Sequence, residues 1–319
     1  MAYNYPRRQA GGAGRPQLHD FNHIYKVLAT SIFETISPTR CVVCDMPGSV
    51  LCEGCASSLP FIDLARACPR CGAPYGRMLC TECPMPGSES ALLHPEEAFS
   101  FTQARSALSF EEGARRIIST YKDGDELRLD AVIASLLCAA IRGRTLGADI
   151  PRPPAVIWGK AGPSAVTSSE AERPAVISSE AERSREISSS LPLQDWTQWA
   201  DALVYVPASP EALLRRGFDH MERVAEIVSR RTGMALVHAL ASCKGARDQR
   251  ELGRGERLAN RSGSFSLAVE AISGADSLPQ RIVLIDDVFT TGATLSAAAH
   301  TLLDGGVREI RTVTCCRVW

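Results

Sequence analysis

Residues 282–294 constrain the fold of this chain more than any other stretch. They read I-V-L-I-D-D-V-F-T-T-G-A-T: four apolar residues, two adjacent acids and a turn rich in Thr and Gly. An aliphatic run without polar alternation predicts a strand buried on both faces, as in a parallel sheet. We therefore expect an α/β domain in which Asp286 and Asp287 stand at the carboxyl end of this strand, where open α/β sheets bind ligands.

The turn after the two acids predicts an anion site. Residues 290–294 supply small side chains, hydroxyls and backbone N–H groups just before a helical pattern that starts at Leu295. Such a turn at a helix N-terminus binds anions, and the acids can accept hydrogen bonds from ribose hydroxyls. The pattern thus favours a ligand with both a sugar and a phosphate. The alternative is an ordinary strand–turn–helix corner, but paired carboxylates at a buried edge need a compensating partner.

Eight of the twelve cysteines form four C-x-x-C pairs within residues 37–90. They are Cys41, Cys44, Cys52, Cys55, Cys68, Cys71, Cys80 and Cys83. Two such turns complete a four-thiolate shell around one tetrahedral ion, so we predict a small module with one or two structural Zn²⁺ ions. Whether consecutive or interleaved pairs share an ion stays open.

The cysteine pattern also indicates a reducing compartment rather than disulfides. Cys138, Cys243, Cys315 and Cys316 stand outside any pair, and we interpret them as structural thiols.

Size and charge narrow the function classes. A length of 319 residues predicts two domains, and a net charge of −1 gives no global attraction to nucleic acid or membrane. No apolar run is long enough to span a bilayer and the first residues lack a signal-peptide pattern, so we expect a cytoplasmic protein with no membrane span.

Three segments fall outside the α/β pattern. Residues 1–19 predict a disordered leader, and residues 20–36 predict an amphipathic helix that packs on the chain's own domain or docks on a partner or membrane surface. Residues 165–174 are repeated almost verbatim at 175–184, which predicts a disordered insert over about residues 146–195. The insert is either a tolerated surface loop or a regulatory element. The α/β domain would then cover residues 98–319 with this interruption.

Elements before the insert are predicted from periodicity. We expect a strand over 101–110, helices over 111–120 and 127–142, and between the helices a turn over 121–125 that carries Lys122.

Elements after the insert begin with a strand over 202–206, which ends at a small-residue turn of Pro207, Ala208 and Ser209. Such a turn could hold a pyrophosphate against its backbone N–H groups. Arg215 and Arg216 follow, and arginines offer bidentate contacts to phosphate; a solvated helix start is the alternative.

The remaining elements are predicted as follows: a helix through Arg231, a strand near 235–240, a helix over 295–303 and a final strand over 310–314. His220, which precedes the first of these helices, is interpreted as structural, because a lone histidine usually is.

Residues 244–261 carry six cations against three acids, with interspersed glycines. Three interpretations stay open: a lid that closes over a pyrophosphate, a basic arm for nucleic acid, or a charged surface loop.

Residues 282–294 resemble the phosphoribosyl pyrophosphate (PRPP) loop of type I phosphoribosyltransferases. With the cysteine module, the whole pattern resembles the ComF family over residues 21–142 and 196–319. Further motifs that carry the resemblance are Tyr121-Lys122 with Gly124, Val206-Pro207, Arg215-Arg216-Gly217-Phe218, Gln249, Glu256-Arg257 and Asn260. Family members commonly have Asn-Gln after the Arg-Gly-Phe, where this chain departs with Asp219-His220.

The resemblance implies a type I phosphoribosyltransferase-like parallel sheet flanked by helices and preceded by a small Cys-rich zinc module. It implies that Asp286 and Asp287 orient the ribose as catalytic residues, with Mg²⁺ bound alongside PRPP. The PRPP loop would comprise Val288, Phe289, Thr290, Thr291, Gly292, Ala293 and Thr294. The pyrophosphate would be bound by Pro207, Ala208, Ser209, Arg215, Arg216 and Lys122.

The function implied is phosphoribosyl transfer to an unknown acceptor, linked to DNA uptake in natural competence or to DNA utilisation. Implied partners are single-stranded DNA and a competence helicase-type protein. The alternative is a non-catalytic adaptor that binds single-stranded DNA or a protein through the zinc module and the basic segment 244–261.

Overall fold

The computed structural model describes residues 38–74, 80, 83, 99–124, 126–145, 193–243, 264–268 and 277–318. The chain divides into two compact units, Met1–Cys52 and Glu53–Trp319. The predicted leader 1–19, the helix 20–36, the insert over 146–192 and the basic segment 244–261 lie outside the described residues. Within the described ranges, no helix has both the length and the apolar character needed to cross a membrane.

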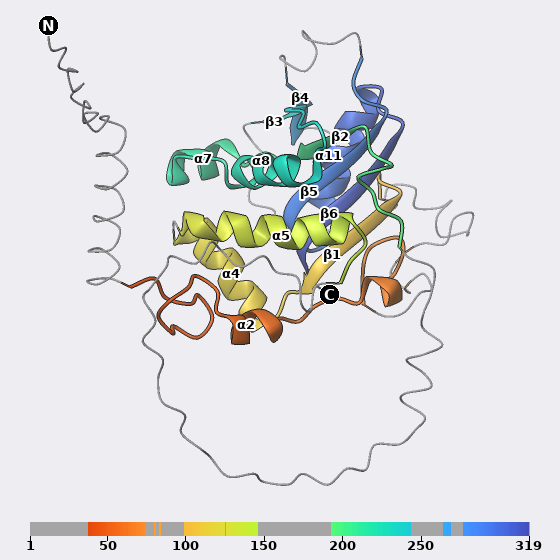
Figure 1. Ribbon diagram of the computed structural model, residues 1–319. Helices are drawn as coiled ribbons and strands as arrows, with labels where there is room; N and C mark the ends of the chain where they lie inside the picture. Colours follow the sequence, from red (N-terminus) through yellow and green to blue (C-terminus); the bar gives the residue numbers. More distant parts are fainter. Residues whose placement is uncertain are drawn as a thin grey trace, which may run out of the picture. The chain divides into compact units, whose positions relative to one another are not determined.

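The second unit is built on a four-stranded parallel sheet with the strand order β1-β6-β5-β2 (Figure 1). Its strands are β1 (Gln103–Ser109), β2 (Ala202–Tyr205), β5 (Arg281–Phe289) and β6 (Glu309–Arg317). Residues 282–285 of β5 are completely buried, because β2 and β6 flank the strand and helices cover both faces. The prediction of a buried parallel strand from its aliphatic run is confirmed.

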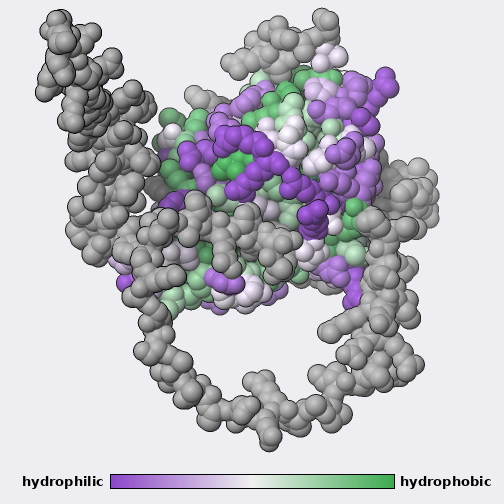
Figure 2. Space-filling view, in the orientation of Figure 1, coloured by the Kyte–Doolittle hydropathy of each residue, from purple (hydrophilic) through white to green (hydrophobic). Residues whose placement is uncertain are grey.

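Helices α5 (Asp130–Ile141) and α8 (His220–Thr232) pack side by side, and each also contacts the sheet (Figure 1). Helix α11 (Ala293–Asp304) connects β5 to β6 and contacts both. Because β5-to-β6 runs across the sheet in the direction opposite to β1-to-β2, right-handed crossovers place α5 and α11 on opposite faces. The exposed residues of α8 include Arg223, Glu226 and Arg230, and Figure 2 shows a hydrophilic surface over this helix.

Helix α4 (Glu112–Asp123) is longer than predicted, so the turn expected over 121–125 is corrected. Tyr121 is buried and continues the apolar stripe of Ala114, Ile117 and Ile118, so packing carries the helix one turn further. Lys122 therefore lies in the last turn of α4 rather than in a loop. A 3₁₀ turn, η3 (Leu127–Leu129), leads from there into α5.

Strand β5 also extends past its predicted end and contains both acids. The pairing with β6 continues from Asp286↔Thr314 to Phe289↔Arg317. The two carboxylates therefore sit within the last four residues of the strand, and the loop begins at Thr290.

Two further elements differ from the sequence-based expectation. A short helix, α7 (Pro210–Arg216), begins at the N-cap Ser209 with Pro210 in its first turn, a start signal present in the sequence. The strand expected near 235–240 is instead a single parallel bridge of Leu236 to Leu203, followed by the hairpin β3 (Leu240–Ser242) and β4 (Phe265–Leu267).

The described chain resumes at Leu193, slightly before the predicted end of the insert at about 195. The buried Trp196 explains this boundary, since the Arg105 guanidinium lies 3.9 Å from its ring centroid and donates to the Gln194 carbonyl. The remaining short elements, α2 (Glu53–Ser57) and η1 (Leu64–Arg66), belong to the cysteine-rich segment.

Candidate functional site

Asp286 and Asp287 are buried, with only 8% and 4% of their surface exposed. Being adjacent in a strand, their side chains point to opposite faces of the sheet. Oδ1 of Asp286 accepts a hydrogen bond from the backbone N–H of Asp287 at 2.8 Å. Its Oδ2 has no protein partner within the described residues.

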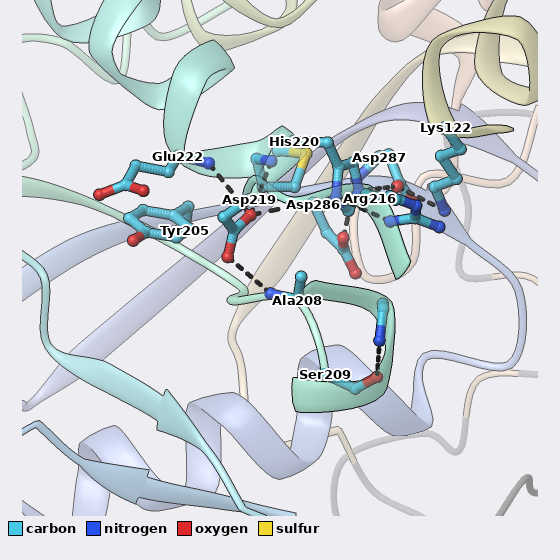
Figure 3. A network of polar contacts seen from close by, with 12 residues as sticks. Lys122, Tyr205, Ala208, Ser209, Arg216, Asp219, His220, Glu222, Asp286 and Asp287 are labelled. Atoms are coloured by element: carbon cyan, nitrogen blue, oxygen red, sulfur yellow. Dashed lines mark hydrogen bonds and ion pairs between the residues drawn. The ribbon is translucent and has the colours of Figure 1, made fainter. Parts of the chain in front are cut away.

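The carboxylate of Asp287 is compensated by two side chains from distant elements (Figure 3). Oδ2 lies 2.5 Å from Nζ of Lys122 on α4 and 2.7 Å from Nε2 of His220 on α8. A buried carboxylate without such partners would carry a large desolvation cost. The compensating partner that the sequence called for is thus present.

The environment shifts the pKa values of the two acids in opposite directions. Burial raises the pKa of Asp287, but the charge of Lys122 and the bond from His220 outweigh it and hold the pKa well below the ordinary range. For Asp286, burial and, after it, the negative charge of Asp287 both raise the pKa, which therefore lies well above the ordinary range. Asp287 is therefore firmly ionised, whereas Asp286 takes up a proton more readily than an ordinary aspartate.

Arg216 joins this network through His220. Its Nη1 lies 3.2 Å from Nδ1 of His220. Because a guanidinium can only donate, Nδ1 is the acceptor and Nε2 carries the proton that is donated to Asp287. This fixes one neutral tautomer of His220 and joins Arg216, His220 and Asp287 in a chain.

The structure separates the two predicted phosphate-binding arginines. The side chain of Arg216 is 10% exposed and its buried Nε has no hydrogen-bond partner within the described residues. Arg215 is 65% exposed and lies 3.9 Å from the equally exposed Asp123. An unpaired buried donor costs about 1–3 kcal/mol, so Arg216 is the arginine that an anion would satisfy.

The predicted pyrophosphate turn of Pro207, Ala208 and Ser209 follows β2, and two of its polar groups have protein partners. Ala208 N–H donates to Oδ2 of Asp219 at 2.7 Å, and Ser209 Oγ accepts from Ala212 N–H as the cap of α7. Oδ1 of Asp219 accepts the N–H groups of Met221 and Glu222, so this residue also caps α8. Asp219 therefore ties the turn to the helix that carries His220.

Residues 290–294, called the anion loop below, lie between β5 and α11. Thr290, Thr291 and Thr294 are exposed. The N-cap Gly292 has no side chain, and Ala293 N–H, the first of α11, donates to Oγ1 of Thr291 at 3.4 Å. Gly292 adopts φ +78°, and a Cβ there would lie 2.6 Å from the rings of both Phe289 and Phe99. The loop thus requires glycine at this position, and the N–H groups of a helix start are donors for an anion.

Two contributors were missed by the sequence interpretation. His220 was read as structural, yet it bonds Asp287, and no sequence signal could have found this contact across two elements. Asp219 had a signal, because an acid directly before a helix is a typical N-cap.

The eight paired cysteines form two clusters, Cys41/Cys44/Cys52/Cys55 and Cys68/Cys71/Cys80/Cys83, which we call the first and second clusters. In each, the sulfurs lie within 4.8 Å of one another. Consecutive pairs therefore come together rather than interleaved ones. None of the eight cysteines is in a disulfide bond.

Sulfur spacing fits a tetrahedral metal rather than a disulfide. Four thiolates with bonds of about 2.3 Å to Zn²⁺ would have sulfurs about 3.8 Å apart. The observed Sγ–Sγ distances are 3.6 Å for Cys44–Cys52, 4.0 Å for Cys68–Cys83 and 3.5 Å for Cys71–Cys80. In the second cluster, the hydrogen bond from Cys83 lowers the pKa of Cys71 to about 5. Both clusters could hold a zinc ion.

No protein-family model matches this chain. It is 29% identical over 114 residues to Competence protein ComFC of Streptococcus pneumoniae, a match that covers 36% of this chain and 47% of that protein. It is 32% identical over 113 residues to Competence protein F of Haemophilus influenzae, covering 35% of this chain and 48% of that protein. The chain thus spans about half the length of these curated relatives.

Proposed function

We propose that this chain is a ComF-family protein whose α/β domain binds PRPP with Mg²⁺ and transfers the phosphoribosyl group to an acceptor. The observation that carries the proposal is the convergence of Lys122 and His220 on buried Asp287 of β5, with Arg216 bonded to His220, shortly before the anion loop. Cationic side chains beside carboxylates and a helix start suit a ligand with hydroxyls at its centre and phosphates at both ends.

Different residues of the site would bind different parts of PRPP. Oδ2 of Asp286, which lacks a protein partner in the described residues, would accept a ribose hydroxyl, while Asp287 holds Lys122 and His220 in place. The anion loop would bind the 5-phosphate through its threonine hydroxyls and backbone N–H groups. Arg216, with its unpaired Nε, would bind the pyrophosphate. Mg²⁺, when bound with PRPP, would offset the charge of the pyrophosphate.

In the transfer step, the bond between the anomeric carbon and the pyrophosphate oxygen breaks, and the acceptor's electron pair forms the new bond to that carbon. Positive charge develops on the ribose and is stabilised by the nearby carboxylates. Negative charge moves to the departing pyrophosphate, where Arg216 and Lys122 would stabilise it. Catalysis would therefore rest on positioning and electrostatics.

The biological context follows from the relatives. Both are named as competence proteins, which supports a role connected with DNA uptake for this chain. Single-stranded DNA and a competence helicase-type protein are then the expected partners.

Isothermal titration calorimetry with PRPP and Mg²⁺ tests the proposal. We expect saturable heat with the wild type and its loss in Asp286→Ala/Asp287→Ala. The absence of heat with the folded, zinc-loaded wild type would reject PRPP binding. A salt-dependent gel shift on single-stranded DNA by the same preparation would then favour the adaptor function.

A further inference from the structure

The second cysteine cluster shares one hydrophobic core with the residues that flank the anion loop. Cys68, Cys71 and Cys83 are buried and pack in the same cluster as Phe101, Phe289 and Leu295. Phe289 is the last residue before the loop and Leu295 is the first buried residue after it. The thiols therefore lie in the core that supports both ends of the loop.

Arg70 connects the Cys68–Cys71 turn to the chain that leads into β1. Its Nη1 donates to the Thr102 carbonyl at 3.1 Å and its Nη2 to the Phe99 carbonyl at 2.8 Å. The turn itself is tight, with Gly72 N–H bonded to the Cys68 carbonyl and Cys68 N–H bonded to the Ala73 carbonyl. The position of Phe99 thus depends on the position of this turn.

Phe99 in turn defines the space available to the loop. Its ring stacks on Phe101 at 4.8 Å and meets the edge of Phe289 at 5.6 Å. The rings of Phe99 and Phe289 together close the space beside Gly292, where a Cβ would lie 2.6 Å from each. The neighbouring Ser100 N–H donates to Ser296 Oγ at 3.0 Å in α11. A shift of Phe99 would therefore displace both the loop glycine and the start of α11.

We propose that a thiophilic divalent cation bound by the second cluster sets the shape of the anion loop, with Arg70 and Phe99 as positioning residues. Metal binding at this cluster and phosphate binding at the loop are then coupled, and each strengthens the other by the same factor. The core that supports the loop includes cysteines of the second cluster and none of the first. The part of this inference that concerns phosphate affinity rests on the proposed function, whereas the part that concerns loop order does not.

Hydrogen–deuterium exchange of the zinc-loaded chain tests the coupling without any ligand. Cys80→Ser removes a thiol from the second cluster, and Cys52→Ser is its matched control in the first cluster, since both cysteines are half-buried. We expect Cys80→Ser to accelerate exchange across residues 289–296 while the amides of residues 282–285 stay protected, and Cys52→Ser to leave both regions unchanged. Equal protection of the loop in the two variants would overturn the inference.

Arg70→Ala provides the decisive variant if Cys80→Ser loses the protection of β5 as well. It leaves all eight thiols in place, so zinc content should remain that of the wild type. We expect faster exchange in the loop and roughly tenfold weaker binding of PRPP, within the range typical of coupled sites. Arg70→Lys, which can still donate to one of the two carbonyls, should restore part of the effect. Wild-type exchange and affinity in Arg70→Ala would reject Arg70 as the connection.

Cobalt substitution gives a spectroscopic readout of the reverse effect, that of PRPP binding on the metal site. With Co²⁺ in the second cluster only, in the Cys52→Ser background, PRPP should change the visible absorption of the metal; with Co²⁺ in the first cluster only, it should not. Binding of PRPP with no spectral change would contradict the coupling. Absence of PRPP binding would reject the proposed function instead, and the exchange experiment would still decide the inference.

Discussion

Nζ of Lys122 lies 2.5 Å from Oδ2 of Asp287, so one ion pair joins the last turn of α4 to the end of β5. The lysine is 27% exposed on its side chain and the aspartate 6%. The lysine remains charged, because burial lowers its pKa but the charge of Asp287 more than compensates and raises it overall. This pair offsets the desolvation cost of burying Asp287.

Replacing Lys122 with Met should destabilise the protein by about 3 kcal/mol. This value is the lower end of the range for breaking a buried ion pair, and we use it because the lysine is partly exposed. The change leaves Asp287 with His220 alone. Arg116→Ala on the same helix is the control: its pair with Glu112 is exposed at both ends and should contribute under about 1 kcal/mol. Urea denaturation of both variants measures the difference, and equal losses would argue against the buried pair as a stabilising contact.

Asp286→Asn should stabilise the protein at neutral pH while it weakens PRPP binding. A carboxyl group whose pKa is raised in the folded state binds its proton more tightly there than in the unfolded chain, so its contribution to stability falls as pH rises above the unfolded pKa of about 3.9. Asparagine stays neutral and its oxygen can still accept the N–H of Asp287. The variant should therefore exceed the wild type at pH 7 and match it near pH 4 in urea denaturation. A variant less stable than the wild type at pH 7 would contradict the raised pKa.

The opposite pH dependence is expected for Asp287, whose pKa is lowered in the fold. Its contribution is present above the unfolded pKa of about 3.9 and is lost as pH falls through the folded value. Lys122→Met should remove most of this acid-side loss. Thermal unfolding between pH 2 and pH 5 checks the slope, and an unchanged slope would assign the acid transition to other carboxylates.

His220→Gln should retain PRPP binding, whereas His220→Leu should lose it. The imidazole donates to Asp287 and accepts from Arg216, and a glutamine amide can do both with its nitrogen and its oxygen. Leucine can do neither, so Asp287 and Arg216 each lose a hydrogen-bond partner. Calorimetry on the two variants tests whether these two hydrogen bonds of His220 support PRPP binding. Similar PRPP affinities in both would show that the histidine only fills space.

Arg216→Ala should weaken PRPP binding by roughly 10- to 150-fold, the equivalent of one hydrogen bond to a charged group. Arg215→Ala removes a neighbouring charge that is 65% exposed and should change the affinity less than about twofold. Comparing the two variants distinguishes a direct contact between the arginine and the pyrophosphate from the effect of removing any nearby positive charge. Equal losses in both would assign the contribution to overall charge.

Much of the architecture was predictable because it depends on local pattern. The aliphatic run before Asp286 predicted a buried parallel strand, and the spacing of the C-x-x-C pairs predicted a module with one or two four-thiolate metal sites. Element ends were less predictable: α4 and β5 both run on through polar residues, because Tyr121 packs on the domain and because β6 continues alongside to Arg317.

By itself, the sequence determined which chemistry the chain carries: adjacent acids, a glycine turn before a helix, and thiols at metal-binding spacing. These are local properties, set by the order of side chains along a few turns of backbone. Only the tertiary structure decided which groups meet: that Lys122 and His220 share Asp287, that Arg216 points inward while Arg215 points outward, and that consecutive cysteine pairs come together. Those contacts join elements that are far apart in the chain. They form because the packing of the sheet and helices brings their side chains together, and the spacing of these residues along the sequence does not predict that packing.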